Sequence, residues 1–352
     1  MKRKLVLVLL LPIVMIYNAC DDYLDVVPDG LATVDKIFNL RQEAEKYLFT
    51  CYSYMPRLGN LRRNAGFLAG DEMWVPDNRE NGDYFALEIA LGRQRVANPY
   101  YDVWQGEYQG GLPFDGSEIW DGIRHCNIFI QNMSDPSNVP DITPTERERW
   151  IAEVKFLKAY YHFYLMRHYG AIPIIKENVS VDAPTPSFDV SRDPYDEGIT
   201  YIIGLLDEAA AVLPPVIADI NTEYGRITSV IAKSLKARIL VTAASPLYNG
   251  NPDLSVMINK DGTPLYNTAF EASKWEIAAD AAKEAIDAAE AAGLRLYKFN
   301  KASTGFNLTD TTVTKLSIRN AITDPESFEV IWPNTQSLTD GADGLQASAM
   351  AP

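Results

Sequence analysis

The stretch that decides the fold runs from Ala152 to Ile175 and reads AEVKFLKAYYHFYLMRHYGAIPII. Apolar residues recur along it with the three- and four-residue spacing of one helical face, at Val154, Leu157, Tyr161 and Leu165. A second face carries further large apolar residues, at Phe156, Tyr160, Phe163 and Met166. Because a helix that is apolar over most of its circumference is buried, we expect this segment to form the central helix of the protein.

The sequence also marks both ends of this helix. Upstream, Thr143 is a candidate N-cap, Pro144 suits the first helical position, and Glu146 completes a T-x-x-E capping box. Downstream, Gly170 can adopt the left-handed conformation that follows many helices, and Pro173 prevents the helix from continuing.

The same stretch resembles the central signature of the RagB/SusD family, in which an alanine-glutamate pair precedes an aromatic-rich helix and then tyrosine-glycine and a proline. Here the matching residues are Ala152-Glu153, Tyr160 to Tyr164, and Tyr169-Gly170-Ala171-Ile172-Pro173. Lys158 departs from the family, which often has arginine there. A second landmark, Gly-Arg-x-Thr before an alanine-rich helix, matches Gly225 to Thr228, and an earlier helix carries the expected Trp120 and Asn127.

This resemblance covers nearly all of the chain and implies a fold and a function. The fold is mainly α: a TPR-like scaffold of helical pairs with long irregular loops and few short strands. The function is that of a cell-surface lipoprotein that captures oligosaccharides and delivers them to a SusC-like, TonB-dependent transporter in the outer membrane. Family members are generally longer, so we expect the chain to be truncated at its C-terminus.

The N-terminus has the pattern of a lipoprotein signal peptide. Lys2-Arg3-Lys4 form a basic start, and Leu5 to Ile16 form an apolar run that is too short to span a bilayer. Ala19 directly before Cys20 resembles a lipobox. We therefore expect residues 1–19 to be a signal peptide, Cys20 to be lipidated, and residues 20–34 to form a tether at the outer membrane. The resemblance implies that the protein is exposed at the cell surface.

Composition limits the classes of partner. The chain has 352 residues and a formal net charge of −15, so a phosphate backbone would be repelled and nucleic acid is excluded as a partner. Aromatic residues make up 11% of the chain. Most of them are expected in the core, and the others suit a platform for sugar rings.

Residues 35–352 are expected to form one SusD-like helical domain. A first helix is expected from about Asp35 to Tyr54, and later helices from Ile119 to Met133 and from Ser273 to Gly293. Asp193 is expected to cap another helix, with Pro194 at its first position. Glu326 to Ile331 resembles a strand-like segment of the family. Between the first two helices, residues 61–118 are rich in glycine and proline, and a loop region of this length is usually functional.

This loop region supplies the candidate ligand-binding residues. Flat aromatic faces stack on sugars, and amides and guanidinium groups hydrogen-bond their hydroxyls. The candidates are Trp74, Asn78, Arg79, Asn81, Tyr84, Trp104 and Tyr108, with Asp77 as a further acceptor. Packing under the loops is the alternative for each aromatic residue, and turn formation is the alternative for Asn78 and Asn81.

No catalytic motif is present, and we expect neither an enzyme nor a cofactor or metal. His162 and His168 are six residues apart on one helix and face different directions, and His125 stands alone. Cys51 and Cys126 are expected to be buried free thiols. Two alternatives remain open: the same scaffold binding a peptide or another non-sugar nutrient, and a lipoprotein glycosidase built from loop carboxylates such as Asp71, Glu72, Glu107 and Asp121.

Overall fold

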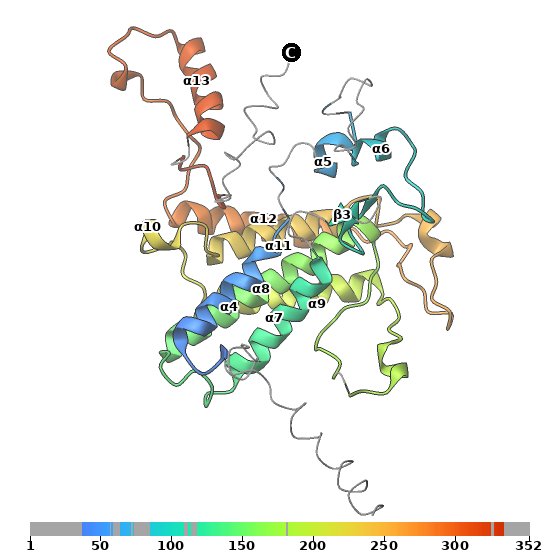
Figure 1. Cartoon of the computed structure of the whole chain (residues 1–352). Helices are drawn as coiled ribbons and strands as arrows, with labels where there is room; N and C mark the ends of the chain where they lie inside the picture. The colour runs from blue at the N-terminus through green and yellow to red at the C-terminus, as the bar shows by residue number, and fades with distance from the viewer. Residues whose placement is uncertain are drawn as a thin grey trace, which may run out of the picture.

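The chain folds around a bundle of helices, shown in the computed structural model of Figure 1. The structure describes residues 37–56, 58, 64–71, 73, 85–108, 112–113, 118–180, 182–324 and 327–333. Residues 107–108 and 112–113 are described by their backbone alone. The expected signal peptide, Cys20 and the tether lie outside the described residues.

The predicted central helix is helix α8, Pro144–Tyr169. Its buried residues come from all sides of the helix and include Trp150, Phe156, Tyr161 and Leu165. α4 (Arg41–Ser53), α7 (Ile119–Ser134) and α9 (Tyr195–Val212) pack against it. The prediction that this segment is buried on most faces is therefore confirmed.

Successive helices pack side by side, as expected for a scaffold of helical pairs. α7 packs on α8, α8 on α9, α9 on α11 (Ser229–Ala244), and α11 on α12 (Ser273–Ala291). In Figure 1, α11 and α12 lie across one end of the bundle. The contact between α11 and α12 is made by small residues, Ala237, Ala281 and Ala285, which let the two helix backbones approach closely.

Shorter elements complete the described part. They are α5 (Ala65–Leu68), α6 (Leu87–Ala90), α10 (Ile220–Glu223), α13 (Asp310–Thr323) and three 3-10 turns at Thr185–Phe188, Pro252–Val256 and Lys301–Ser303. α13 stands away from the bundle in Figure 1 and buries none of its residues. None of the helices in the described ranges is long and apolar enough to cross a membrane.

The loop region contains a small antiparallel sheet with the order β1-β2-β3. Its strands are β1 (Tyr101–Asp102), β2 (Glu107–Tyr108) and β3 (Leu112–Pro113). Tyr101 pairs with Tyr108, and Tyr108 pairs with Leu112. Glycine and proline in this region restrict the strands to two residues each, which agrees with the predicted few short strands.

The ends of α8 follow the prediction closely. The Thr143 hydroxyl accepts a hydrogen bond from the Glu146 backbone N–H at 3.3 Å, and Pro144 is the first helical residue. Gly170 has φ of +71°, a conformation that favours glycine. The reciprocal half of the capping box is wrong, because the Glu146 carboxylate binds the Arg41 guanidinium, 3.0 Å from Nε to Oε2.

Three other predictions of local structure need correction. The predicted first helix is interrupted, because residues 38–40 form a turn between the helical residue Ile37 and α4, which begins at Arg41. The Asp193 carboxylate accepts a hydrogen bond from the Ile174 N–H, so Pro194 and not Asp193 is the N-cap of α9. The segment before Ile331 turns, with the Val330 N–H bonded to the Ser327 carbonyl, because that local bond replaces pairing with another strand.

Candidate functional site

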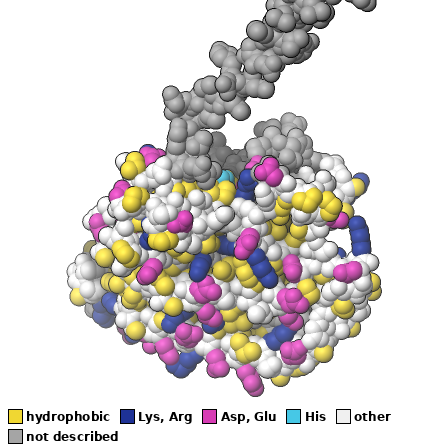
Figure 2. Space-filling view, turned by 90° about the horizontal axis from the view of Figure 1, so that it is seen from below, with side chains coloured by type: hydrophobic (Ala, Val, Ile, Leu, Met, Phe, Trp, Pro, Cys, Tyr) yellow, Lys and Arg dark blue, Asp and Glu magenta, His cyan; other side chains and the backbone are white. Residues whose placement is uncertain are grey.

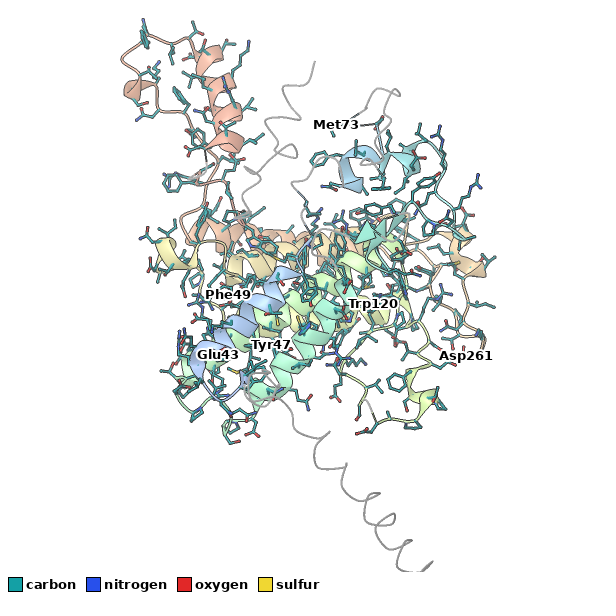
Figure 3. The ribbon with its side chains drawn as sticks, viewed as in Figure 1. Glu43, Tyr47, Phe49, Met73, Trp120 and Asp261 are labelled. Carbon is teal, nitrogen blue, oxygen red and sulfur yellow. The ribbon has the colours of Figure 1, made fainter. Side chains whose placement is uncertain are left out.

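A cluster of three aromatic side chains lies where α7 begins and α8 ends. The ring centroid of Trp104 is 4.9 Å from that of Trp120 and 5.4 Å from that of Tyr169, and both contacts are edge-to-face. Trp120 belongs to α7, Tyr169 is the last residue of α8, and Trp104 lies in the turn between β1 and β2. Figure 3 places Trp120 at the end of α7 that is close to the small sheet. We call these three residues the aromatic cluster.

The turn that carries Trp104 is held by hydrogen bonds to the scaffold. The Trp104 N–H lies 2.9 Å from the Asp102 carboxylate and 2.8 Å from the Tyr169 hydroxyl. That hydroxyl in turn donates to Asp102 at 3.1 Å. Burial raises the pKa of Tyr169, so the hydroxyl stays protonated and able to donate. These bonds fix a loop tryptophan on the end of a rigid helix.

A cavity of about 170 Å³ adjoins the cluster, lined by Trp104, Gln105, Glu118, Ile119, Trp120 and Asp121. Trp104 is 38% exposed. The buried indole nitrogen of Trp120 has no hydrogen-bond partner in the structure. The site therefore offers aromatic surface next to carboxylate and amide groups, the combination that a polyhydroxylated ring requires.

The structure describes only part of the predicted ligand set. Trp104 joins the aromatic cluster. Tyr108 is described by its backbone, which pairs with β1 and β3. The remaining five candidates lie outside the described residues: Trp74, Asn78, Arg79, Asn81 and Tyr84.

Sequence reasoning missed the other two members of the cluster. Its helical register predicts Trp120 in the core, and the structure agrees in part: Trp120 is partly buried against the core and also packs edge-on against the loop residue Trp104. Tyr169 was noticed only as part of a tyrosine-glycine pair. Its position as the last residue of a buried helix was the available signal, since a side chain there can reach the loops at the helix end.

A buried ionic network joins the two sequence landmarks. Glu153, which is 0% exposed, accepts from Arg226 at 2.9 Å and 3.1 Å, in a bidentate arrangement. Tyr52 donates to the same carboxylate at 2.7 Å, and Arg149 lies 3.1 Å away as a second cation. Arg149 and Arg226 both also bind Glu223. Glu153 comes from the Ala-Glu pair and Arg226 from Gly-Arg-x-Thr, so these landmark residues hold α8 to the start of α11.

The histidines and cysteines have structural surroundings. Burial lowers the pKa of His162 to about 4, and its ring nitrogens contact the Lys158 carbonyl and the Ile175 N–H. His168 contacts the Tyr164 carbonyl, and His125 contacts the Tyr47 hydroxyl. Cys51 and Cys126 are buried free thiols, as predicted. Across the described ranges, no three acidic, histidine or cysteine side chains are grouped so that they would hold a metal ion.

Comparison with known proteins identifies the class. Residues 78–241 match a SusD-like family described as "Starch-binding associating with outer membrane". The solved structure of a protein titled BT4246 superposes with a TM-score of 0.66 at 26% identity, over 85% of this chain and 51% of that one. No curated protein sequence matches the chain.

Two further solved structures have the same fold. A SusD-like protein from Bacteroides fragilis superposes with a TM-score of 0.59 at 16% identity, over 90% of this chain and 48% of that one. A SusD homolog from Bacteroides thetaiotaomicron gives a TM-score of 0.50 at 19% identity, over 72% of this chain and 42% of its own. The chain thus spans about half the length of the structures that it matches.

These matches define a SusD-like helical scaffold. The family match over residues 78–241 and the fold together support a SusD/RagB-family protein.

Proposed function

We propose that this protein binds carbohydrate at the surface of the outer membrane, captures oligosaccharides and passes them to a SusC-like, TonB-dependent transporter. The observation that carries the proposal is the aromatic cluster with its adjoining cavity, in a chain of which residues 78–241 match a family described as starch-binding. A sugar ring presents C–H groups on its faces and hydroxyls around its edge. The exposed indole of Trp104 can stack on a face of the sugar ring. Gln105 and Asp121 line the same cavity and can hydrogen-bond the hydroxyls.

The proposal includes the predicted loop residues around this cluster. Trp74, Asn78, Arg79, Asn81, Tyr84 and Tyr108 are proposed to extend the surface over which a glycan chain lies. Cys20 is proposed to carry the lipid that anchors the protein, and residues 1–19 to be removed as a signal peptide. The family description includes association with the outer membrane, which supports this location.

The first experiment is native affinity electrophoresis of the chain without residues 1–20, in gels that contain single plant, host or microbial polysaccharides. The proposal expects that at least one polysaccharide slows migration. Trp104→Ala should abolish the retardation. Trp275→Ala, which removes a 43% exposed tryptophan of α12 outside the cluster, should leave it unchanged and serves as the matched control.

The other candidate functions give different results in the same assay. A peptide-binding protein would migrate normally in every glycan gel while remaining folded by circular dichroism. A glycosidase would release reducing sugar from the polysaccharide that retards it. The proposed protein binds and releases no product.

A further inference from the structure

A second cavity lies along the middle of α7 and α8, and it shares no lining residue with the cavity beside the aromatic cluster. Its volume is about 450 Å³, which falls in the range of small-molecule sites. The polar residues that line it are Asn127, Gln131, Lys158, Lys176, Glu177 and Asn178. The proposed glycan function uses none of them.

Lys158 is the unusual member of this lining. It is 3% exposed, and its ammonium donates one hydrogen bond, at 2.6 Å, to the Lys176 carbonyl. An ammonium group has three N–H donors. No carboxylate of the described residues lies within ion-pair distance of it, in contrast to Lys155 one turn earlier, which binds Glu208. Burial lowers the pKa of Lys158 to about 8, so the group is mostly charged at neutral pH.

A second cation, Lys176, lines the same cavity. The ammonium of Lys176 is 5.7 Å from the centroid of the Tyr201 ring, and that of Lys158 is 5.5 Å from the same centroid. Glu177 is the one carboxylate of the lining. The lining therefore has one positive charge in excess. Glu177 attracts Lys158 only from beyond ion-pair distance, and a buried cation without a direct ion pair is stabilised when an anion binds to it.

The amide wall of the cavity is fixed in position. Asn127 donates to the Asn178 side-chain oxygen at 3.0 Å, and Asn178 donates to the Arg124 carbonyl at 3.0 Å. Gln131 lies on the same face of α7, one turn after Asn127. Amide groups both donate to and accept from hydroxyls, so this wall suits a hydroxylated ligand.

We propose that this cavity is a binding site for a small hydroxylated monocarboxylate, such as a sugar acid. The carboxylate lies against the Lys158 and Lys176 ammonium groups, and the hydroxyls face Asn127 and Gln131. The single excess charge favours a monoanion over a dianion. This inference is independent of glycan binding at the aromatic cluster.

The test is calorimetric titration of the purified chain with D-galacturonate, D-galactose and sulfate. Galacturonate should bind. Galactose, which is neutral, and sulfate, which is a dianion, should each bind at least tenfold more weakly than galacturonate. Lys158→Met should weaken the binding of galacturonate at least tenfold. Lys155→Met, which removes the same charge from the same helix outside the cavity, should leave the affinity unchanged.

Lys176→Gln provides a second variant, because Lys176 lies after α8 and its replacement leaves the buried helix intact. It should also weaken galacturonate several-fold. The proposal is overturned if galacturonate gives no heat with the folded protein, or if galactose or sulfate binds equally well. Unchanged affinity in both Lys158→Met and Lys176→Gln would overturn it as well.

Discussion

Replacing Arg226 with methionine should destabilise the protein strongly, because it removes the main ionic partner of a buried carboxylate. Arg226 is 7% exposed and makes a bidentate pair with Glu153. Breaking such a pair by removing one member costs about 3–5 kcal/mol of the free energy of unfolding. Tyr52 and Arg149 still contact Glu153 in the variant. We therefore expect Arg226→Met to lower the free energy of unfolding by about 3 kcal/mol, the lower end of that range.

The double variant Glu153→Gln/Arg226→Met tests the physical cause. It leaves neither charge unpaired, and the glutamine side-chain oxygen can still accept from Tyr52. Because the large cost comes from a buried charge without its partner, the double variant should lie within about 1–2 kcal/mol of the wild type. The coupling between the two positions should then exceed about 1 kcal/mol.

The pH dependence of the free energy of unfolding tests the same cause independently. Burial raises the pKa of Glu153, and the charges of Arg226 and Arg149 oppose this shift. Without Arg226 the pKa of the folded state rises further above that of the unfolded state. A carboxyl group with a raised folded-state pKa loses stability as pH rises through that range, so Arg226→Met should be closer to wild type in mild acid than at neutral pH.

The assay is urea unfolding followed by tryptophan fluorescence and far-UV circular dichroism, whose transitions should coincide if unfolding is two-state. Lys283→Met, which breaks an exposed pair with Asp287 on α12, is the control and should change little. The reasoning is refuted if Arg226→Met costs less than about 1 kcal/mol, or if the double variant is as unstable as the sum of its single variants.

Two other perturbations follow from the surroundings of α8. His162 has a folded-state pKa of about 4, below its ordinary 6.5, so the free energy of unfolding should fall as pH drops from about 6.5 to about 5. His162→Gln should remove about 1.5 kcal/mol of that fall. An equal fall in both proteins, measured by urea titration at each pH, would contradict this. Gly170→Ala should destabilise by about 2–4 kcal/mol, because φ is positive and the new Cβ would collide with the Tyr266 hydroxyl. The control Gly204→Ala has open space on α9 and should be neutral or stabilising, so equal thermal unfolding midpoints for the two variants would count against the steric account.

The central helix could be predicted because its signals are local. Apolar residues around α8, the Thr143 cap and the glycine at its end each depend on neighbours within a few residues. Predictions failed where a distant partner competed. Glu146 binds Arg41 and not the backbone of Thr143, and Asp193 binds the Ile174 N–H and does not cap α9.

The candidate site could be predicted only as a region. Loop composition selected Trp104, but its partners come from the start of one helix and the end of another. The spacing of Trp120 in α7 could not distinguish a side chain that packs in the core from one that faces a loop. The pairing of Glu153 with Arg226 joins residues 73 positions apart, which sequence periodicity does not reveal.

The face of the molecule shown in Figure 2 does not by itself indicate where the site lies. Figure 2 shows one face on which acidic, basic and apolar side chains are interspersed, with no large area of one kind. Binding on this protein is therefore better sought at the cavities that named residues define than at a charged surface.

The most direct test of the account is calorimetric titration of an oligosaccharide, cut from the polysaccharide that retards the protein, into wild type, Trp104→Ala and Trp275→Ala. The account predicts binding to wild type and to Trp275→Ala with the same affinity, and a loss of at least tenfold in Trp104→Ala. Equal affinity for all three proteins would contradict it, because the sugar would then bind away from the aromatic cluster.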